Sequence, residues 1–143
     1  MANLAGVGSR IVAVIVDHII LAVISFALAM PFGLINYSAA SMMNPLAAIG
    51  AMAGYSVISV AIFLLYFTYF EGTSGQTLGK RLVSIKVVKE NGKKMTYADA
   101  FIRSILRIVD GIAAYLIGFI VVLASEKKQR VGDMAAGTLV VKA

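Results

Sequence analysis

Two long apolar stretches dominate the first half of the chain. They cover about residues 11–35 and 46–70, and each exceeds the roughly 20 residues that a helix needs to cross a bilayer. The segment between them, residues 36–45, is short, polar and uncharged, and its Asn44-Pro45 pair is typical of a turn before a helix. The pattern predicts an all-α membrane protein that begins with a transmembrane helical hairpin.

Lys and Arg lie on one side of this hairpin. Arg10 precedes it and six basic residues follow it within residues 80–94, whereas residues 36–45 contain none. Because positive residues mark the cytoplasmic side of a membrane protein, we expect both termini in the cytoplasm. Residues 73–82 continue on that side as a short amphipathic helix, whose N-cap is expected to be one of its first two residues, Thr73 or Ser74.

A small cytoplasmic β-hairpin is expected next. Residues 82–89 are rich in β-branched and alternating side chains, and the Asn91-Gly92 pair that follows is a strong turn signal, so these residues should pair with residues 93–96. Residues 138–142 form another β-branched run. They could add a third strand, which an isolated hairpin needs for stability.

The third apolar region, residues 98–124, is charged in its first half and purely apolar over about 14 residues in its second half. A stretch of that length is typical of a re-entrant or interfacial segment. A single crossing would place the basic residues 127–130 outside, against the positive-inside rule. We expect a bent or re-entrant helical region that returns residues 125–143 to the cytoplasm as a tail, with one tilted crossing as the alternative. Residues 1–143 would then form one membrane domain.

The composition agrees with a membrane protein. The chain is 60% hydrophobic and 14% charged, against roughly 25% charged residues in an ordinary soluble domain. The net charge of +6 does not predict a nucleic-acid partner, because the basic residues flank apolar spans and suit anionic lipid head groups. With no cysteine and one histidine, we expect no metal, no cofactor, no catalytic residue and no enzyme activity.

Ionisable residues at membrane depth are the candidate functional residues. Arg10 and Asp17 are seven residues apart, which places them on one helix face about two turns apart. Arg10 can reach the head groups, whereas Asp17 lies deeper, where a carboxylate must be paired, protonated or hydrated. Asp17 is either an ion carrier or a buried contact that orients helices. It also makes the first stretch a poor candidate for a cleaved signal peptide.

A second set of charges lies in the third region. Asp99, Arg103, Arg107 and Asp110 recur at spacings of four, four and three, which places them in one stripe along a helix. Either the stripe compensates its own charges, or it faces Asp17 and lines a hydrated path for an ion or proton.

The chain resembles the RDD family of small membrane proteins over nearly its whole length. Four segments carry the resemblance: Arg10 to Asp17, Gly75-Gln-Thr-Leu-Gly-Lys-Arg-Leu82, Arg103-Ser-Ile-Leu-Arg107 with Asp110, and Gln129-Arg-Val-Gly-Asp133. The resemblance implies that Arg10, Asp17 and Asp133 are the residues for which the family is named. The family often has a histidine before the last aspartate, and Gly132 at this position argues against a proton relay there.

The resemblance implies a transport-related function, most concretely monovalent cation/proton antiport. Asp17 would be the carrier, and Arg10 and Asp133 would form a cytoplasmic gate. Because three apolar regions are few for a transport path, we expect a homo-oligomer. The alternative is a non-transporting membrane scaffold that recruits a partner. The candidate pathway residues are Asp17, Arg10, Asp133, Asp110, Arg103 and Arg107.

Two contacts follow from the expected topology. If both termini are cytoplasmic, Asp133 returns to the surface where Arg10 begins the first span, so we expect these two side chains to touch. Asp17 is expected to pair with Arg10, Arg103 or Arg107, because an arginine gains most from a carboxylate where water competes least.

The topology can be tested by thiol labelling, since the chain contains no cysteine. In intact cells Ser41→Cys should react with a membrane-impermeant maleimide, because it lies near the external turn. Ser125→Cys should react only after the membrane is opened, because it follows the region expected to turn back. Labelling of Ser125→Cys from outside would show that the third region crosses once.

Overall fold

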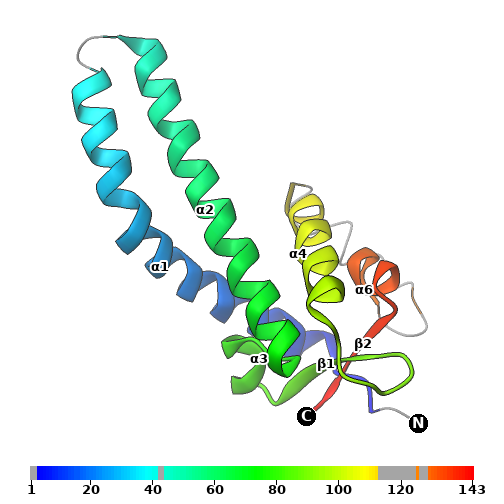
Figure 1. The fold of residues 1–143 in the computed structure, drawn as a ribbon. Helices are drawn as coiled ribbons and strands as arrows, with labels where there is room; N and C mark the ends of the chain where they lie inside the picture. The colour runs from blue at the N-terminus through cyan, green and yellow to red at the C-terminus, as the bar shows by residue number, and fades with distance from the viewer. Residues whose placement is uncertain (1–2, 42–43, 113–124, 126–128) are drawn as a thin grey trace. The chain divides into compact units, whose positions relative to one another are not determined.

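The computed structural model describes residues 3–41, 44–112, 125 and 129–143 of the chain. Its elements are α1 (Val7–Ser41), α2 (Pro45–Ser74), α3 (Leu78–Leu82), β1 (Ile85–Lys89), α4 (Tyr97–Ile112), α6 (Val131–Ala135) and β2 (Thr138–Lys142) (Figure 1). This confirms the expected fold class, which is mostly helical with a small antiparallel sheet. The chain divides into a hairpin unit, His18–Leu65, and a sheet unit, Met1–Asp17 with Tyr66–Ala143.

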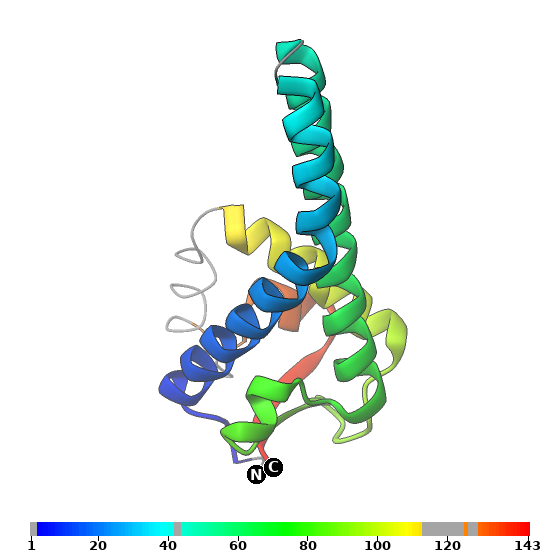
Figure 2. The ribbon, with the colours of Figure 1, turned by 90° about the vertical axis from the view of Figure 1, so that its left-hand side faces the viewer.

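The hairpin unit consists of parts of α1 and α2, which run antiparallel (Figure 1, Figure 2). The His18 ring meets the edge of Phe63, with 6.3 Å between the ring centroids. Large apolar side chains point away from the protein, among them Ile19, which is 60% exposed, and Val57, which is 68% exposed. Such apolar exposure along a helix suits lipid rather than water.

Two helices in the described part of the chain are long and apolar enough to cross a membrane, over Val7–Leu28 and Ala48–Ser74. They correspond to the two apolar stretches of the sequence. The expected turn over residues 36–45 is too long, because α1 continues to Ser41. The helix start is as expected: α2 begins at Pro45, and the Asn44 side-chain oxygen accepts a hydrogen bond of 2.9 Å from the Leu46 N–H.

The short helix after α2 begins later than expected. The Thr73 and Ser74 hydroxyls donate to carbonyl oxygens one turn earlier, so they belong to the last turn of α2 instead of capping a new helix. Gly75 ends α2 with a φ of +70°, a conformation that glycine adopts at little cost. The N-cap of α3 is Thr77, whose hydroxyl accepts a hydrogen bond from the Lys80 N–H.

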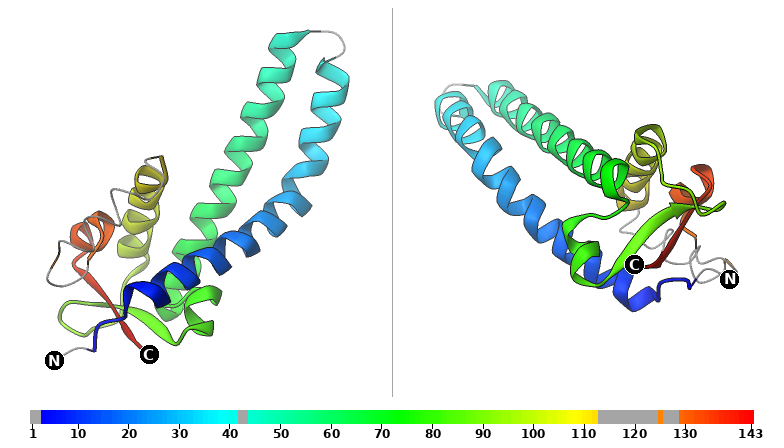
Figure 3. Two further views of the ribbon diagram at one scale, coloured as in Figure 1. Left: turned by 180° about the vertical axis from the view of Figure 1, so that it is seen from behind. Right: turned by 60° about the horizontal axis from the view of Figure 1, so that its bottom comes forward.

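The core of the sheet unit lies around β1 and β2, which pair antiparallel with Val87 opposite Val140 (Figure 3). Before α1, the Ala5 N–H donates to the Val140 carbonyl oxygen at 2.9 Å, which adds the N-terminal residues to the edge of β2. Its central cluster of buried apolar side chains contains Ala5, Ala13, Ile85, Val87, Met95, Ala100 and Val140.

The partner of β1 is β2, so the expected pairing with residues 93–96 is wrong. The turn at Asn91-Gly92 does form, since the Lys89 N–H donates to the Lys93 carbonyl oxygen at 2.9 Å. The pairing stops there because Thr96 begins the next helix: Thr96 and Asp99 cap each other's backbone N–H groups at the start of α4. β2 in turn places the buried Val140 in the core.

The bent third region cannot be compared as a whole. α4 covers its first half, and residues 113–124 lie outside the described residues. The choice between a bent pair and a single crossing therefore stays a prediction.

Gly75→Ala should destabilise the protein because two effects combine. The residue has a φ of +70°, and a Cβ at this position would lie 2.5 Å from the Val87 carbonyl oxygen of β1. We expect the free energy of unfolding to fall by about 2–4 kcal/mol, measured by denaturant titration with circular dichroism in detergent.

Gly92→Ala is the matched control for this variant. Gly92 has a φ of +76°, but nothing lies within 4 Å of its Cβ position. Backbone strain alone should therefore cost about 1 kcal/mol. Equal losses in the two variants would mean that the close approach of Gly75 to β1 is absent in the protein.

Candidate functional site

The carboxylate of Asp17 is held by three neutral donors. Its side chain is buried in the sheet unit, with 1% of its surface exposed. Oδ1 accepts hydrogen bonds of 2.8 Å from the Tyr66 hydroxyl and from the Gly79 N–H, and Oδ2 accepts one of 2.5 Å from the Thr77 hydroxyl. The expected pairing of Asp17 with an arginine is therefore wrong.

A close approach of α3 to α1 makes these contacts possible. A Cβ at Gly79 would lie 2.3 Å from the Ala13 carbonyl oxygen and 2.9 Å from Cγ of Asp17, so only glycine fits. Thr77 precedes Gly79 as the N-cap of α3, and Tyr66 reaches Asp17 from α2. The Gly75–Leu82 segment of the sequence thus carries two of the three donors.

Glu71, near the end of α2, is the centre of a second network. It has no exposed surface. Its carboxylate accepts hydrogen bonds from Lys80 Nζ at 2.5 Å, Arg103 Nε at 3.0 Å and Arg107 Nη2 at 2.8 Å. The guanidinium carbon of Arg107 also lies 3.8 Å from the centre of the Phe67 ring, a cation–π contact. One buried carboxylate therefore faces three cationic side chains.

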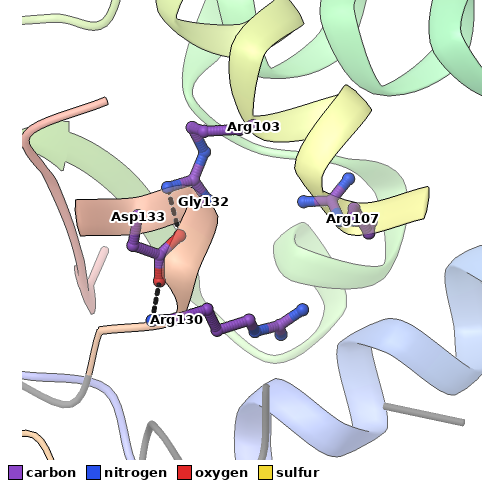
Figure 4. Close-up of a pocket in the computed structure, with 5 residues that line it drawn as sticks. All are labelled: Arg103, Arg107, Arg130, Gly132 and Asp133. Carbon is purple, nitrogen blue, oxygen red and sulfur yellow. Dashed lines mark hydrogen bonds and ion pairs between the residues drawn. The ribbon is translucent and has the colours of Figure 1, made fainter. Parts of the chain in front are cut away.

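Asp133, in α6, is the centre of the adjoining network (Figure 4). It accepts hydrogen bonds from Arg103 Nη1 and, at 3.1 Å, from the Arg130 N–H. Arg10 Nη1 lies 3.8 Å from its Oδ2, which confirms the expected contact between Arg10 and Asp133. Arg103 thus joins the two carboxylates, Glu71 and Asp133, and its Nη1 also donates to the Thr138 hydroxyl.

Burial and charge act in opposite directions on the pKa values of this network. Burial would raise the pKa of Asp133, but Arg103 and Arg130 outweigh it and hold that pKa below its ordinary value. Burial lowers the pKa of Lys80 to about 8, against the opposing attraction of Glu71. Both groups are therefore charged near neutral pH, and their ion pairs are intact there.

Of the two pairs expected along the charged stripe of α4, Asp99 with Arg103 does not form, and Arg107 with Asp110 lies outside the described residues. Asp99 accepts from Lys89 Nζ at 2.9 Å and from Thr96, not from Arg103. Arg103 and Arg107 contact Glu71, and not Asp17. Asp110 is also one of the expected pathway residues, and its side chain lies outside the described residues.

Sequence reasoning missed Glu71, Tyr66 and Thr77. Glu71 directly follows the second apolar stretch, residues 46–70, and it is the first carboxylate after more than 50 residues without one. An acidic residue at the end of a span that basic segments follow is a signal for ion pairing, and this signal was available. The donors to Asp17 have no comparable signal, because Tyr and Thr are frequent at such positions.

Comparison with known proteins identifies one family. The sequence profile of the RDD family matches residues 4–137. Two Bacillus subtilis (strain 168) proteins are similar in part: the "Uncharacterized membrane protein YteJ" is 35% identical over 62% of this chain and 54% of its own, and the "Uncharacterized protein YxaI" is 36% identical over 50% and 48%. The chain thus spans about half the length of these relatives. No solved structure matches it.

Replacing Glu71 should be far more damaging than an ordinary loss of charge. Glu71→Gln leaves Lys80 and Arg107 buried without their carboxylate and leaves Arg103 with Asp133 alone. Breaking a buried ion pair from one side costs about 3–5 kcal/mol. The free energy of unfolding of the full chain in detergent measures this loss. Glu90→Gln is the control, because Glu90 is exposed and the new amide oxygen can still accept the hydrogen bond from Gln129. It should change stability by about 0.5 kcal/mol or less. Similar losses in both variants would contradict the central place of Glu71.

Proposed function

The chain belongs to the RDD family and is a membrane protein, and from its buried charges we propose that it exchanges monovalent cations for protons at Asp17. In this proposal Asp17 binds a proton in one state and a cation in the other. Both termini face the cytoplasm, and several copies of the chain together form the path. Arg10 and Asp133 form the cytoplasmic boundary of that path.

The contrast between Asp17 and the other buried carboxylates supports this proposal. In the described part of the chain the buried carboxylates are Asp17, Glu71 and Asp133. Glu71 and Asp133 are ion-paired with basic side chains, whereas the hydrogen-bond donors to Asp17 are all neutral. A buried charge without a counter-charge is costly. A proton or a monovalent cation would balance it, and neither would have to displace an arginine first.

A pathway of this kind also needs its neighbouring charges held in place. Arg103 and Arg107 are engaged by Glu71, and Arg103 also by Asp133. They therefore do not compete with a cation at Asp17 by direct contact. We assign them, with Asp110, to positioning the path and not to carrying the ion.

The second candidate is a non-transporting scaffold that recruits a partner. It is favoured by the same contacts of Asp17, because they connect α1 with α2 through Tyr66 and with α3 through Thr77 and Gly79. On this reading the carboxylate fastens the sheet unit together and carries nothing.

Asp17→Asn separates the two functions. The amide is nearly the same size as the carboxylate; its oxygen can accept from the Gly79 N–H, and its NH₂ can donate to the Thr77 hydroxyl. We therefore expect nearly normal folded yield but no proton exchange, because the amide neither titrates nor carries charge. The measurement is cation-driven proton flux in proteoliposomes with an internal pH dye, tested with Na⁺ and K⁺.

Asp99→Asn is the matched control, because Asp99 is bound to Lys89 and Thr96 away from the Asp17 contacts. It should keep its flux. Absence of flux in the unmodified protein, with verified orientation, would refute transport. If yield and flux fell together in Asp17→Asn, the scaffold function would be favoured instead.

A further inference from the structure

A small pocket between α4 and the start of α6 is lined mainly by arginines. Its lining residues are Arg103, Arg107, Arg130, Gly132 and Asp133 (Figure 4). The absence of a side chain at Gly132 lets α6 pack closely on α4, since a Cβ there would lie 3.3 Å from Cβ of Leu106. Asp133 forms part of the wall, but its oxygens are already engaged by Arg103 and by the Arg130 N–H.

Among the described residues, the charges around this pocket do not balance. Glu71 and Asp133 are the carboxylates of the joined networks, and five cationic side chains surround them within the described part of the chain. These are Arg10, Lys80, Arg103, Arg107 and Arg130. The excess of positive charge is greatest at the pocket, because three arginines are among its lining residues.

Two of the pocket arginines have hydrogen-bonding capacity to spare. Arg107 is only 7% exposed in its side chain, and its buried Nη1 has no hydrogen-bond partner among the described residues. Figure 4 shows its guanidinium pointing toward the pocket from α4. Arg130 uses its backbone N–H for Asp133, and no carboxylate in the described residues pairs with its guanidinium. Burial lowers the pKa of Arg130, as expected of a positive charge that has lost water.

We propose that this pocket binds a phosphate-class oxyanion, through the guanidinium groups of Arg107 and Arg130. Guanidinium groups form paired, charge-assisted hydrogen bonds with such anions. A phosphate group would satisfy the buried Nη1 of Arg107 and offset the positive charge of the pocket. The pocket is too small to enclose a whole phosphate group, so an oxygen of the phosphate would enter it while the rest stays at its mouth, either as free phosphate or at the end of a lipid head group.

This site is separate from the proposed exchange site. The donors at Asp17 come from Tyr66, Thr77 and Gly79, and none of these lines the pocket. Anion binding therefore stands whether or not Asp17 carries an ion.

Arg130→Gln is the variant that tests the proposal. Arg130 is only partly buried, and its guanidinium forms no direct ion pair among the described residues, where Asp133 is paired with Arg10 and Arg103, so the fold should survive. Arg81→Gln is the matched control: it removes the same charge from an exposed arginine in α3 that hydrogen-bonds Ser74. Circular dichroism checks the fold of both. If Arg130→Gln does not fold, Arg130→Lys is used in its place, with Arg81→Lys as its control. The two lysine variants are compared in the same binding experiments.

Two binding experiments distinguish the sources of the anion. In an uncharged detergent, the full chain is titrated with inorganic phosphate at constant ionic strength, by calorimetry, with chloride as the reference anion. In nanodiscs, phosphatidic acid in phosphatidylcholine is compared with phosphatidylcholine alone, by the shift in thermal unfolding. We expect Arg130→Gln to weaken binding by about tenfold, as for the loss of one charge-assisted contact, and Arg81→Gln to leave it unchanged.

Each outcome decides something. Arg130-dependent binding of inorganic phosphate alone supports a soluble ligand, and Arg130-dependent stabilisation by phosphatidic acid alone supports a lipid head group. Both together support a site for the shared phosphate. The proposal is overturned if phosphate binds no better than chloride and phosphatidic acid gives no stabilisation, or if the Arg130 and Arg81 variants behave alike in both experiments.

Discussion

Glu71 accepts hydrogen bonds from Lys80, Arg103 and Arg107 where no water reaches it, and the positions of the other charged residues depend on this. A buried carboxylate among cations adds little net stability, because desolvation offsets most of the attraction. It does impose geometry, since moving one partner away leaves the others buried and uncompensated. The three cations come from α3 and α4, so Glu71 fixes both helices against the end of α2.

Arg103 extends this constraint into the rest of the sheet unit. Its Nε donates to Glu71, and its Nη1 donates to Asp133 and Thr138. Asp133 lies in α6 and Thr138 begins β2, so Arg103 sets where the C-terminal segment meets the sheet. Arg10 then reaches the same carboxylate from α1. Arg103 and the two acids therefore connect five elements, which are α1, α2, α4, α6 and β2.

The sequence was informative where a single physical rule applied and misleading where partners competed. Bilayer thickness alone predicts the two spans, and a shared membrane surface alone predicts the contact of Arg10 with Asp133. The partners of Asp17 could not be predicted in this way, because its arginine candidates were taken by a carboxylate that the sequence pattern did not single out. The strand pairing failed for a similar reason: Thr96 was needed as a helix cap, so residues 93–96 were not free to pair.

The same competition explains why the buried acids of one small protein lie in two kinds of environment, one with ion pairs and one with neutral hydrogen-bond donors. Glu71 and Asp133 draw the guanidinium groups to themselves, and charge-assisted contacts keep both carboxylates ionised. Asp17 lies on α1 beside the α3 backbone, where Gly79 leaves room only for an N–H and not for a long cationic side chain. Its environment is therefore polar but neutral. Among the described residues the contacts of Asp17 include no ion pair, whereas Glu71 accepts hydrogen bonds from three buried cations. Glu71 and Asp133 are ion-paired, whereas Asp17 has neutral donors. This difference follows from the close backbone approach that Gly79 allows.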